Sequence, residues 1–311
     1  MEGLSTIPWS RLDAWGWSFI VVTLALVLTG GWRLYAGEAT ASASILAEDG
    51  NRHYRMLIRT MGALSFIFIF GALFSEDGQA LLYQLIKPVF KFFKADNVGS
   101  FRNENMSLMF SAGLIAQLLA AGILLVLAQT FPGFMHVQPD GNDRKKLYFK
   151  RADILRLWGL FATCLCLLAI ASILWSFFAQ IAASQGQILP NEIQDVVQLV
   201  ANWNGPSWVL SILFLSVTVG APLIEEIGFR GILYPALRDA IPRGWAIALT
   251  GILFGSLHGN LAALLPISVM GAWLCIVRDR FGLGTCILLH AMNNAWTIFW
   301  LIAAPEIATK L

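Results

Sequence analysis

Side chains capable of acid–base chemistry occur in three otherwise apolar stretches near the end of the chain. The first stretch carries Glu225, Glu226 and Arg230, and the other two carry Phe254–His258 and His290–Asn294. A charge at membrane depth costs about 2.5–3.5 kcal/mol on scales derived from helix insertion. A sequence keeps three such charges within six residues only if they pair, line a wet cavity or take part in a reaction.

These residue types predict a hydrolytic site. A carboxylate and a neutral imidazole near one water molecule activate that water as a nucleophile, and Glu225 with His258 supplies this pair. An imidazole N–H and an amide N–H stabilise a developing oxyanion, and His290 with Asn294 supplies those donors. The reaction class that uses all four groups is hydrolysis of a peptide bond within or at the membrane.

Other uses of the same residues compete with this interpretation. Glu225, His258 and His290 match the two-histidine, one-carboxylate set of a zinc site, although neither histidine stands in an H-E-x-x-H arrangement, and we favour chemistry without a metal. Glu226 and Arg230 are four residues apart, the favourable order for a structural ion pair. A transporter or proton relay also places ionisable groups in the membrane, and a single His or Asn there often joins two helices.

The composition indicates the environment in which these groups lie. The chain of 311 residues is 57% hydrophobic and only 13% charged, whereas soluble proteins have about 25% charged residues. Its apolar stretches are long enough for membrane-spanning helices. We therefore predict an all-α, polytopic integral membrane protein. The net charge of +2, without a basic block, argues against a nucleic-acid partner.

The apolar stretches predict about eight membrane helices. They are Trp15–Leu34, Met56–Phe74, Met106–Gln129, Ile154–Gln180, Trp208–Ile224, Trp245–His258, Leu261–Val277 and Leu283–Ala303. Pro222 is expected to kink or break the fifth of them, because proline removes a backbone hydrogen bond. We divide the chain into an N-terminal transmembrane and accessory region, residues 1–205, and a catalytic core, residues 206–311.

The distribution of basic residues predicts the orientation. The connection Thr130–Arg151 is basic, whereas Ile181–Asn204 contains no Lys or Arg. Because basic loops face the cytoplasm, both termini should face outward. The segment Leu81–Phe93 has lysines at helical spacing, which suits a helix lying in the membrane interface or on a surface, but it falls on the outer side and disagrees with this scheme.

Helix geometry predicts that the three polar stretches meet. Counted from the nearest basic residue at the cytoplasmic end, Glu225, His258 and His290 lie about 20, 22 and 15 Å deep at the helical rise. These depths all fall in the middle of a hydrocarbon core about 30 Å thick. Small residues should let the helices approach one another closely. They are Gly228, Gly231, Gly251, Gly255 and Gly259.

The three stretches resemble the signature of the CPBP intramembrane protease family, which includes the CAAX prenyl proteases and proteins of bacteriocin processing and self-immunity. That signature is EExxxR, FxxxH and HxxxN. Here it stands as Glu225-Glu226-Ile-Gly-Phe-Arg230, as Phe254-Gly-Ser-Leu-His258 and as His290-Ala-Met-Asn-Asn294. The resemblance covers roughly Trp208–Ala303. Gly228 is a departure, because family members often have a bulky apolar residue there.

The resemblance implies a helical membrane fold whose site opens to the cytoplasmic side, in the plasma (inner) membrane. It implies that Glu225 and His258 activate water, that His290 and Asn294 form the oxyanion hole, and that Glu226, Arg230 and Phe254 support them. The family was long labelled metalloprotease and is better viewed as glutamate-dependent. The implied substrates are membrane-anchored or membrane-inserted proteins or peptides. A non-catalytic immunity or binding protein of the same fold is the alternative.

Overall fold

The computed structural model of the chain describes residues 43–74, 81–82, 84–85, 101–130, 135, 151–186 and 207–303. The predicted all-α class is confirmed for this part, in which every regular element is helical. In the described residues before the motif-bearing region the long helices are α2 (Ala43–Phe74), α4 (Phe101–Thr130) and α5 (Arg151–Ser184). The predicted span Trp15–Leu34 and most of Leu81–Phe93 lie outside the described residues.

The first polar motif lies inside one long helical run rather than after a broken helix. The run consists of α7 (Ser207–Leu215), the π-helical segment η2 (Ser216–Gly220), α8 (Ala221–Glu226), a second π-helical segment η3 (Ile227–Leu233) and α9 (Tyr234–Ala240). Three helices follow: α10 (Arg243–Ser256), α11 (Leu261–Phe281) and α12 (Leu283–Ala303). Helix α12 has the bounds predicted for the last apolar stretch, Leu283–Ala303.

The expectation that the fifth span ends at Ile224 is wrong, because helix continues through Pro222 to Ala240. The N–H of Ala221 donates to the carbonyl of Ser216, five residues back, which is the π register. In that register the next N–H would belong to residue 222, and proline has none. The wider π turn thus accommodates the proline, with the loss of one backbone hydrogen bond instead of a break.

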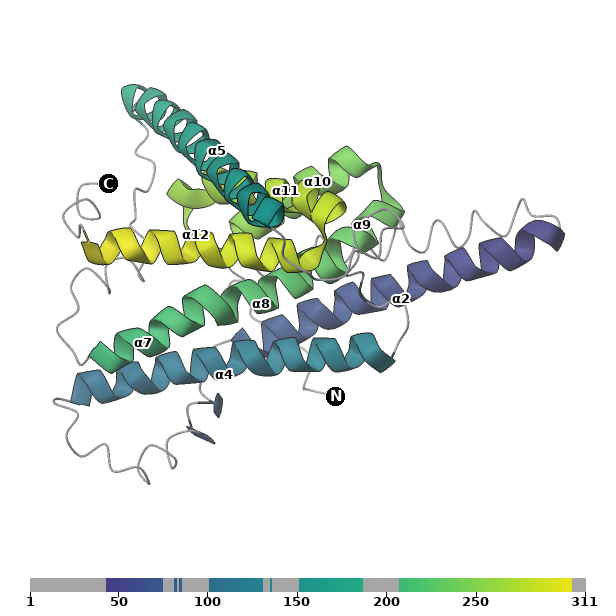
Figure 1. Cartoon of the computed structure of the whole chain (residues 1–311), viewed down its shortest axis with the longest axis horizontal. Coiled ribbons are helices and arrows are strands. Elements are labelled where there is room, and N and C mark those ends of the chain that lie inside the picture. The colour runs from purple at the N-terminus through teal and green to yellow at the C-terminus, as the bar shows by residue number, and fades with distance from the viewer. Residues whose placement is uncertain are drawn as a thin grey trace, which may run out of the picture.

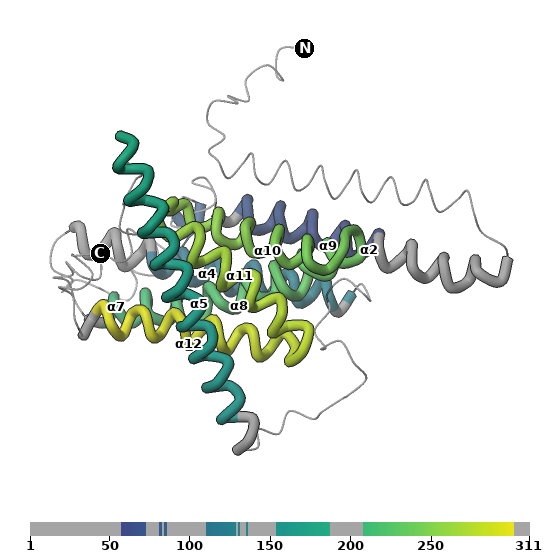
Figure 2. The backbone as a smooth tube through the Cα atoms, turned by 90° about the horizontal axis from the view of Figure 1, so that it is seen from above, coloured from purple at the N-terminus to yellow at the C-terminus, as the bar shows by residue number. Residues whose placement is uncertain are grey.

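The helices pack around the long run (Figure 1). Helices α4 and α12 flank it, and α2 contacts η3 and α9. Helices α10 and α11 form the most extensive pair, and α5 crosses α11 and α12 at a steep angle, with its end projecting beyond them (Figure 2). The motif-bearing helices are thus enclosed by one another and by the three N-terminal helices.

Within the described residues, four helices are long and apolar enough to cross a membrane, which indicates an integral membrane protein. They cover Phe110–Ala128, Ile154–Ser184, Trp208–Ala240 and Leu261–Phe281, and Leu57–Ala72 is a shorter apolar helix. The prediction of about eight spans is not confirmed by the described residues.

Glycines permit the close approach of α10 and α11, as predicted for Gly251 and Gly255. A Cβ atom on Gly251 would lie 2.6 Å from the carbonyl oxygen of Ser268, and one on Gly255 would lie 2.7 Å from that of Leu264. Both distances are too short for a real contact, so only glycine fits. Gly259 serves a turn instead, because its φ of 61° is in the left-handed region that favours glycine.

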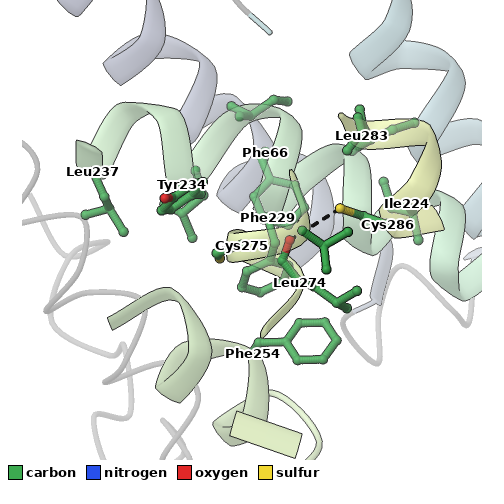
Figure 3. Packing of buried hydrophobic residues seen from close by; sticks show 14 of the residues in the cluster. Phe66, Ile224, Phe229, Tyr234, Leu237, Phe254, Leu274, Cys275, Leu283 and Cys286 are labelled. Carbon is green, nitrogen blue, oxygen red and sulfur yellow. Dashed lines mark hydrogen bonds between the residues drawn. The ribbon is translucent and has the colours of Figure 1, made fainter. Parts of the chain in front are cut away.

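The buried apolar core lies where the long run meets α2, α10, α11 and α12 (Figure 3). Phe229 is its centre, in edge-on contact with Phe66 of α2 and Phe254 of α10, with ring centroids 5.5 and 5.3 Å away. A Cβ atom on Gly228 would lie 2.0 Å from the Phe66 ring. The space left beside Gly228 by the absence of a side chain is therefore filled by the ring of Phe66, from the N-terminal region.

A second polar cluster fixes the end of the bundle where α9, α10 and α11 meet. Asp279 is buried and accepts hydrogen bonds from the hydroxyl of Tyr234 and from three guanidinium groups, those of Arg238, Arg243 and Arg278, at 2.8–3.3 Å. One carboxylate thus joins side chains from three helices. A buried charge is tolerated only with such partners.

Candidate active site

The first motif forms a buried ion pair. Arg230 donates from Nη1 to Oε1 of Glu226 over 2.8 Å, and both side chains are 0% exposed. Arg230 also donates from Nη2 to the carbonyl oxygen of Gly271 in α11, at 2.9 Å. Its guanidinium lies over the Phe254 ring, 4.2 Å from the centroid. The predicted pair therefore ties the long run to α10 and α11.

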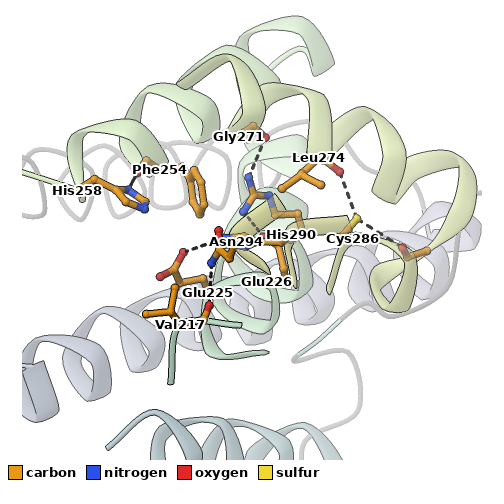
Figure 4. A network of polar contacts seen from close by, with 12 residues as sticks. Val217, Glu225, Glu226, Phe254, His258, Gly271, Leu274, Cys286, His290 and Asn294 are labelled. Atoms are coloured by element: carbon orange, nitrogen blue, oxygen red, sulfur yellow. Dashed lines mark hydrogen bonds and ion pairs between the residues drawn. The ribbon is translucent and has the colours of Figure 1, made fainter. Parts of the chain in front are cut away.

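The ion pair also orients His290 (Figure 4). His290 is 3% exposed, and its Nδ1 lies 2.9 Å from Oε1 of Glu226. Because that oxygen belongs to a carboxylate already paired with Arg230, the carboxylate accepts and Nδ1 carries the hydrogen. A carboxylate that holds one ring nitrogen fixes the orientation of the whole imidazole. The second nitrogen, Nε2, then faces Glu225.

Glu225 is the accessible carboxylate of the two. Its side chain is 18% exposed, and its Oε2 lies 3.9 Å from Nε2 of His290, beyond hydrogen-bonding distance. In the described part of the chain this oxygen has no hydrogen-bond partner. A buried carboxylate oxygen without a donor costs free energy, and a donor such as water satisfies it. Figure 4 shows Glu225 on the same side of the long run as His290 and Asn294.

His258 lies in the turn after α10, where the helix ends. The N–H of His258 donates to Gly255, so the carbonyl of Phe254 lacks its regular helical partner and lies 2.9 Å from Nδ1 of the same histidine. A carbonyl only accepts, so Nδ1 carries the hydrogen and Nε2 of the neutral ring has a lone pair. His258 is exposed. Its Nε2 is therefore suited to take a proton from water.

Phe254 contacts both imidazoles. Its ring centroid is 5.2 Å from that of His258 and 5.6 Å from that of His290. The predicted shared face of Phe254 and His258 is therefore confirmed. Among the contacts of the described residues there is no direct hydrogen bond between His258 and Glu225, the two groups predicted to share a water.

Asn294 is held by a backbone carbonyl of the long run. Its Nδ2 donates to the oxygen of Val217 in η2, over 2.8 Å. An amide group has two N–H donors and one carbonyl oxygen. The bond to Val217 uses one donor and leaves the second N–H and the oxygen for another partner. Asn294 is one helical turn after His290 on α12, so the two present donors from the same face.

The zinc alternative, with Glu225, His258 and His290 as ligands, finds no preassembled ligand set among the described residues. In the part of the chain that the structure describes, no group of three or more His, Cys, Asp or Glu side chains is placed to hold a metal ion. His258 and His290 use Nδ1 for hydrogen bonds to the carbonyl of Phe254 and to Glu226, which leaves Nε2 of each ring, so these bonds do not by themselves argue against a metal. The four cysteines are free, and Cys166 is exposed on α5 whereas the other three are buried.

One polar residue close to the site was not predicted from the sequence. Gln117 of α4 accepts a hydrogen bond from Ser216 in η2, over 2.9 Å. The only signal for it was a glutamine inside the otherwise apolar span Met106–Gln129. A Cβ atom on Gly220 would lie 2.0 Å from Oε1 of Gln117, so this amide lies directly against the long run.

The comparisons with known proteins address the motif-bearing region. Residues 206–296 match the model of a family described as type II CAAX prenyl endopeptidase Rce1-like. The match includes all three polar stretches and supports the recognised resemblance to the CPBP and CAAX protease family. Comparisons of the chain with curated proteins and with solved structures gave no match.

Proposed function

We propose that this chain, whose residues 206–296 match the Rce1-like CAAX prenyl endopeptidases, is an intramembrane endopeptidase that hydrolyses a peptide bond in a membrane-associated protein or peptide. The observation that carries the proposal is Glu225: a partly accessible carboxylate whose Oε2 has no hydrogen-bond donor among the described residues and faces an imidazole held by a buried ion pair. Such a carboxylate binds a water molecule and accepts its proton.

The proposed reaction uses the residues of the three motifs. Glu225, assisted by Nε2 of His258, removes a proton from water as the water oxygen attacks the scissile carbonyl carbon. The C–N bond then breaks, and the same proton passes from Glu225 to the leaving amine. Asn294 and His290 donate to the oxyanion. Nδ1–H of His290 is already bonded to Glu226. Nε2 therefore donates to the oxyanion only when the ring carries a second proton, and the carboxylates of Glu225 and Glu226 then lie next to the cationic ring.

The proposed location is a plasma (inner) membrane, with the site opening to the cytoplasmic side. Basic residues support this orientation, because Arg238, Arg243, Arg278 and Arg280 lie at or near the end of the bundle around Asp279. Basic residues at helix ends favour the cytoplasmic face. The partners are then the bilayer and a membrane-anchored or membrane-inserted substrate, and no nucleic acid is involved.

The decisive experiment compares membrane peptides by mass spectrometry. Cells expressing the wild type are compared with cells expressing Glu225→Gln, each with and without a zinc chelator. We expect new peptide termini only with the wild type, unchanged by the chelator, while circular dichroism shows that the variant is folded. Termini lost with the chelator would indicate a metal enzyme instead. If the two kinds of cells yield the same peptide termini while the wild type still produces a cellular phenotype, the chain is a binding or immunity protein instead.

A further inference from the structure

Helix α4, which carries none of the three motifs, makes a polar contact with the long run through Gln117. Oε1 of Gln117 accepts the hydroxyl of Ser216, which is buried, and the absence of a side chain on Gly220 makes room for the amide. An amide in a membrane helix is expensive unless it bonds within the protein. This contact lies on η2, the π-helical segment that also contains Val217.

Pro222 leaves the carbonyl of Val217 available to a side chain. In the π register set by Ala221 and Ser216, the partner of Val217 would be the N–H of residue 222, which proline lacks. Asn294 of α12 supplies the missing donor, over 2.8 Å. A carbonyl away from water needs such a partner, so the proline leaves this carbonyl free and Asn294 satisfies it.

We propose that Pro222 and the Gln117–Ser216 hydrogen bond are a positioning device for Asn294, an inference that rests on the proposed role of Asn294 in hydrolysis. Pro222 supplies the acceptor by withholding an N–H, and Gln117 holds η2 from the opposite side. Helices α4 and α12 both contact η2. One N–H of Asn294 is thereby fixed on Val217, and the direction of the second N–H follows from the geometry of the planar amide.

A purely structural role makes a different prediction. If Gln117 only joins two helices, its loss lowers stability and leaves the state of Asn294 and the turnover number unchanged. If it positions Asn294, its loss lowers kcat with little change in KM, because an interaction made only in the transition state is weakened. The state of the Asn294 amide is a further readout that requires no substrate.

The first test is the side-chain amide signal of Asn294 in NMR spectra of the full chain with ¹⁵N-labelled asparagine, assigned by its loss in Asn294→Ala. In Pro222→Ala a new backbone N–H competes for the carbonyl of Val217, so we expect the Asn294 signal to move. Pro266→Ala is the matched control, because it restores an N–H within α11 and should leave the signal in place. An unmoved signal in Pro222→Ala would overturn the proposal.

The second test is cleavage of a synthetic peptide that spans a site found by the mass spectrometry above. We expect kcat of Pro222→Ala to fall about 100-fold, as for a small misplacement of a catalytic group. For Gln117→Leu we expect a fall of roughly threefold to twentyfold, the range of one interhelical hydrogen bond. In both variants KM should change less than twofold, and Pro266→Ala should retain the wild-type kcat.

The two proposals fail in different ways. If Glu225→Gln produces the same peptide termini as the wild type, the proposed function is wrong, while the NMR comparison still decides whether Pro222 orients Asn294. If Glu225→Gln is inactive but both Pro222→Ala and Gln117→Leu keep the wild-type kcat, the positioning device is refuted. Ser216→Ala offers a third check, because combining it with Gln117→Leu should cost no more than either change alone.

Discussion

The buried pair of Glu226 and Arg230 provides a test that separates stability from activity. In Arg230→Met, the carboxylate of Glu226 stays fully buried and loses the guanidinium that lies 2.8 Å away. Removing one partner of a buried pair costs about 3–5 kcal/mol. The same change removes the donor to Gly271 and the cation over Phe254, so we expect a loss of free energy of unfolding near the upper end of that range.

A double variant should restore the stability without restoring the activity. Replacing both charges, as in Glu226→Leu with Arg230→Met, leaves no buried unpaired charge, and such replacements are often neutral or stabilising. We therefore expect the double variant to recover most of the lost free energy of unfolding. It removes the acceptor of Nδ1–H of His290, however, so the imidazole loses its orientation. Peptide cleavage should then fall by about 100-fold.

The assay is chemical unfolding in detergent, followed by tryptophan fluorescence, together with cleavage of the peptide identified by mass spectrometry. A second double variant, Glu226→Gln with Arg230→Met, is the matched control, because the amide oxygen still accepts from His290. It should cleave faster than the leucine variant at similar stability. Two results would refute the reasoning: wild-type stability of Arg230→Met, or wild-type cleavage by the variant that carries leucine at position 226.

Two further predictions concern packing. In Gly228→Ala the new Cβ atom would meet the ring of Phe66, so we expect a loss of about 1–3 kcal/mol in thermal unfolding, whereas Gly244→Ala, with nothing within 4 Å, should match the wild type. In Asp279→Asn the three arginines around the carboxylate lose their shared partner, and we expect about 1.5–3 kcal/mol of destabilisation. An unchanged midpoint of thermal unfolding in Gly228→Ala would contradict the packing of Gly228 against Phe66. An unchanged midpoint in Asp279→Asn would contradict a stabilising role of the cluster around Asp279.

The local contacts of the site were predictable because they follow from helical spacing. The i,i+4 relation of Glu226 and Arg230 predicted their ion pair, and the same relation placed Phe254 against His258. The prediction that three helices meet in one layer also holds for Glu225 and His290, which face each other. Each of these predictions needed only the period of the α-helix and the cost of an unpaired charge.

Contacts that depend on irregular backbone were not predictable in the same way. The rule that proline kinks or breaks a helix predicted an interruption at Pro222, but the π turn before it keeps the run continuous. Nothing in the sequence predicted the π register, so the link from Asn294 to Val217 was missed. Gln117 was visible as a polar residue in a span, but its partner depends on how α4 packs.

One polar residue of each motif donates to a backbone carbonyl, which helps to hold the site in an apolar surrounding. Asn294 donates to Val217, where proline has removed the regular partner, and His258 donates to Phe254, where α10 ends. Arg230 donates to the carbonyl of Gly271, where the absence of a side chain lets α10 and α11 approach. Because lipid offers no donors, backbone carbonyls freed in a membrane must be satisfied by the protein itself. The irregularities at Pro222 and at the end of α10 thus each create an acceptor at a defined place, and the side chains of Asn294 and His258 are fixed there.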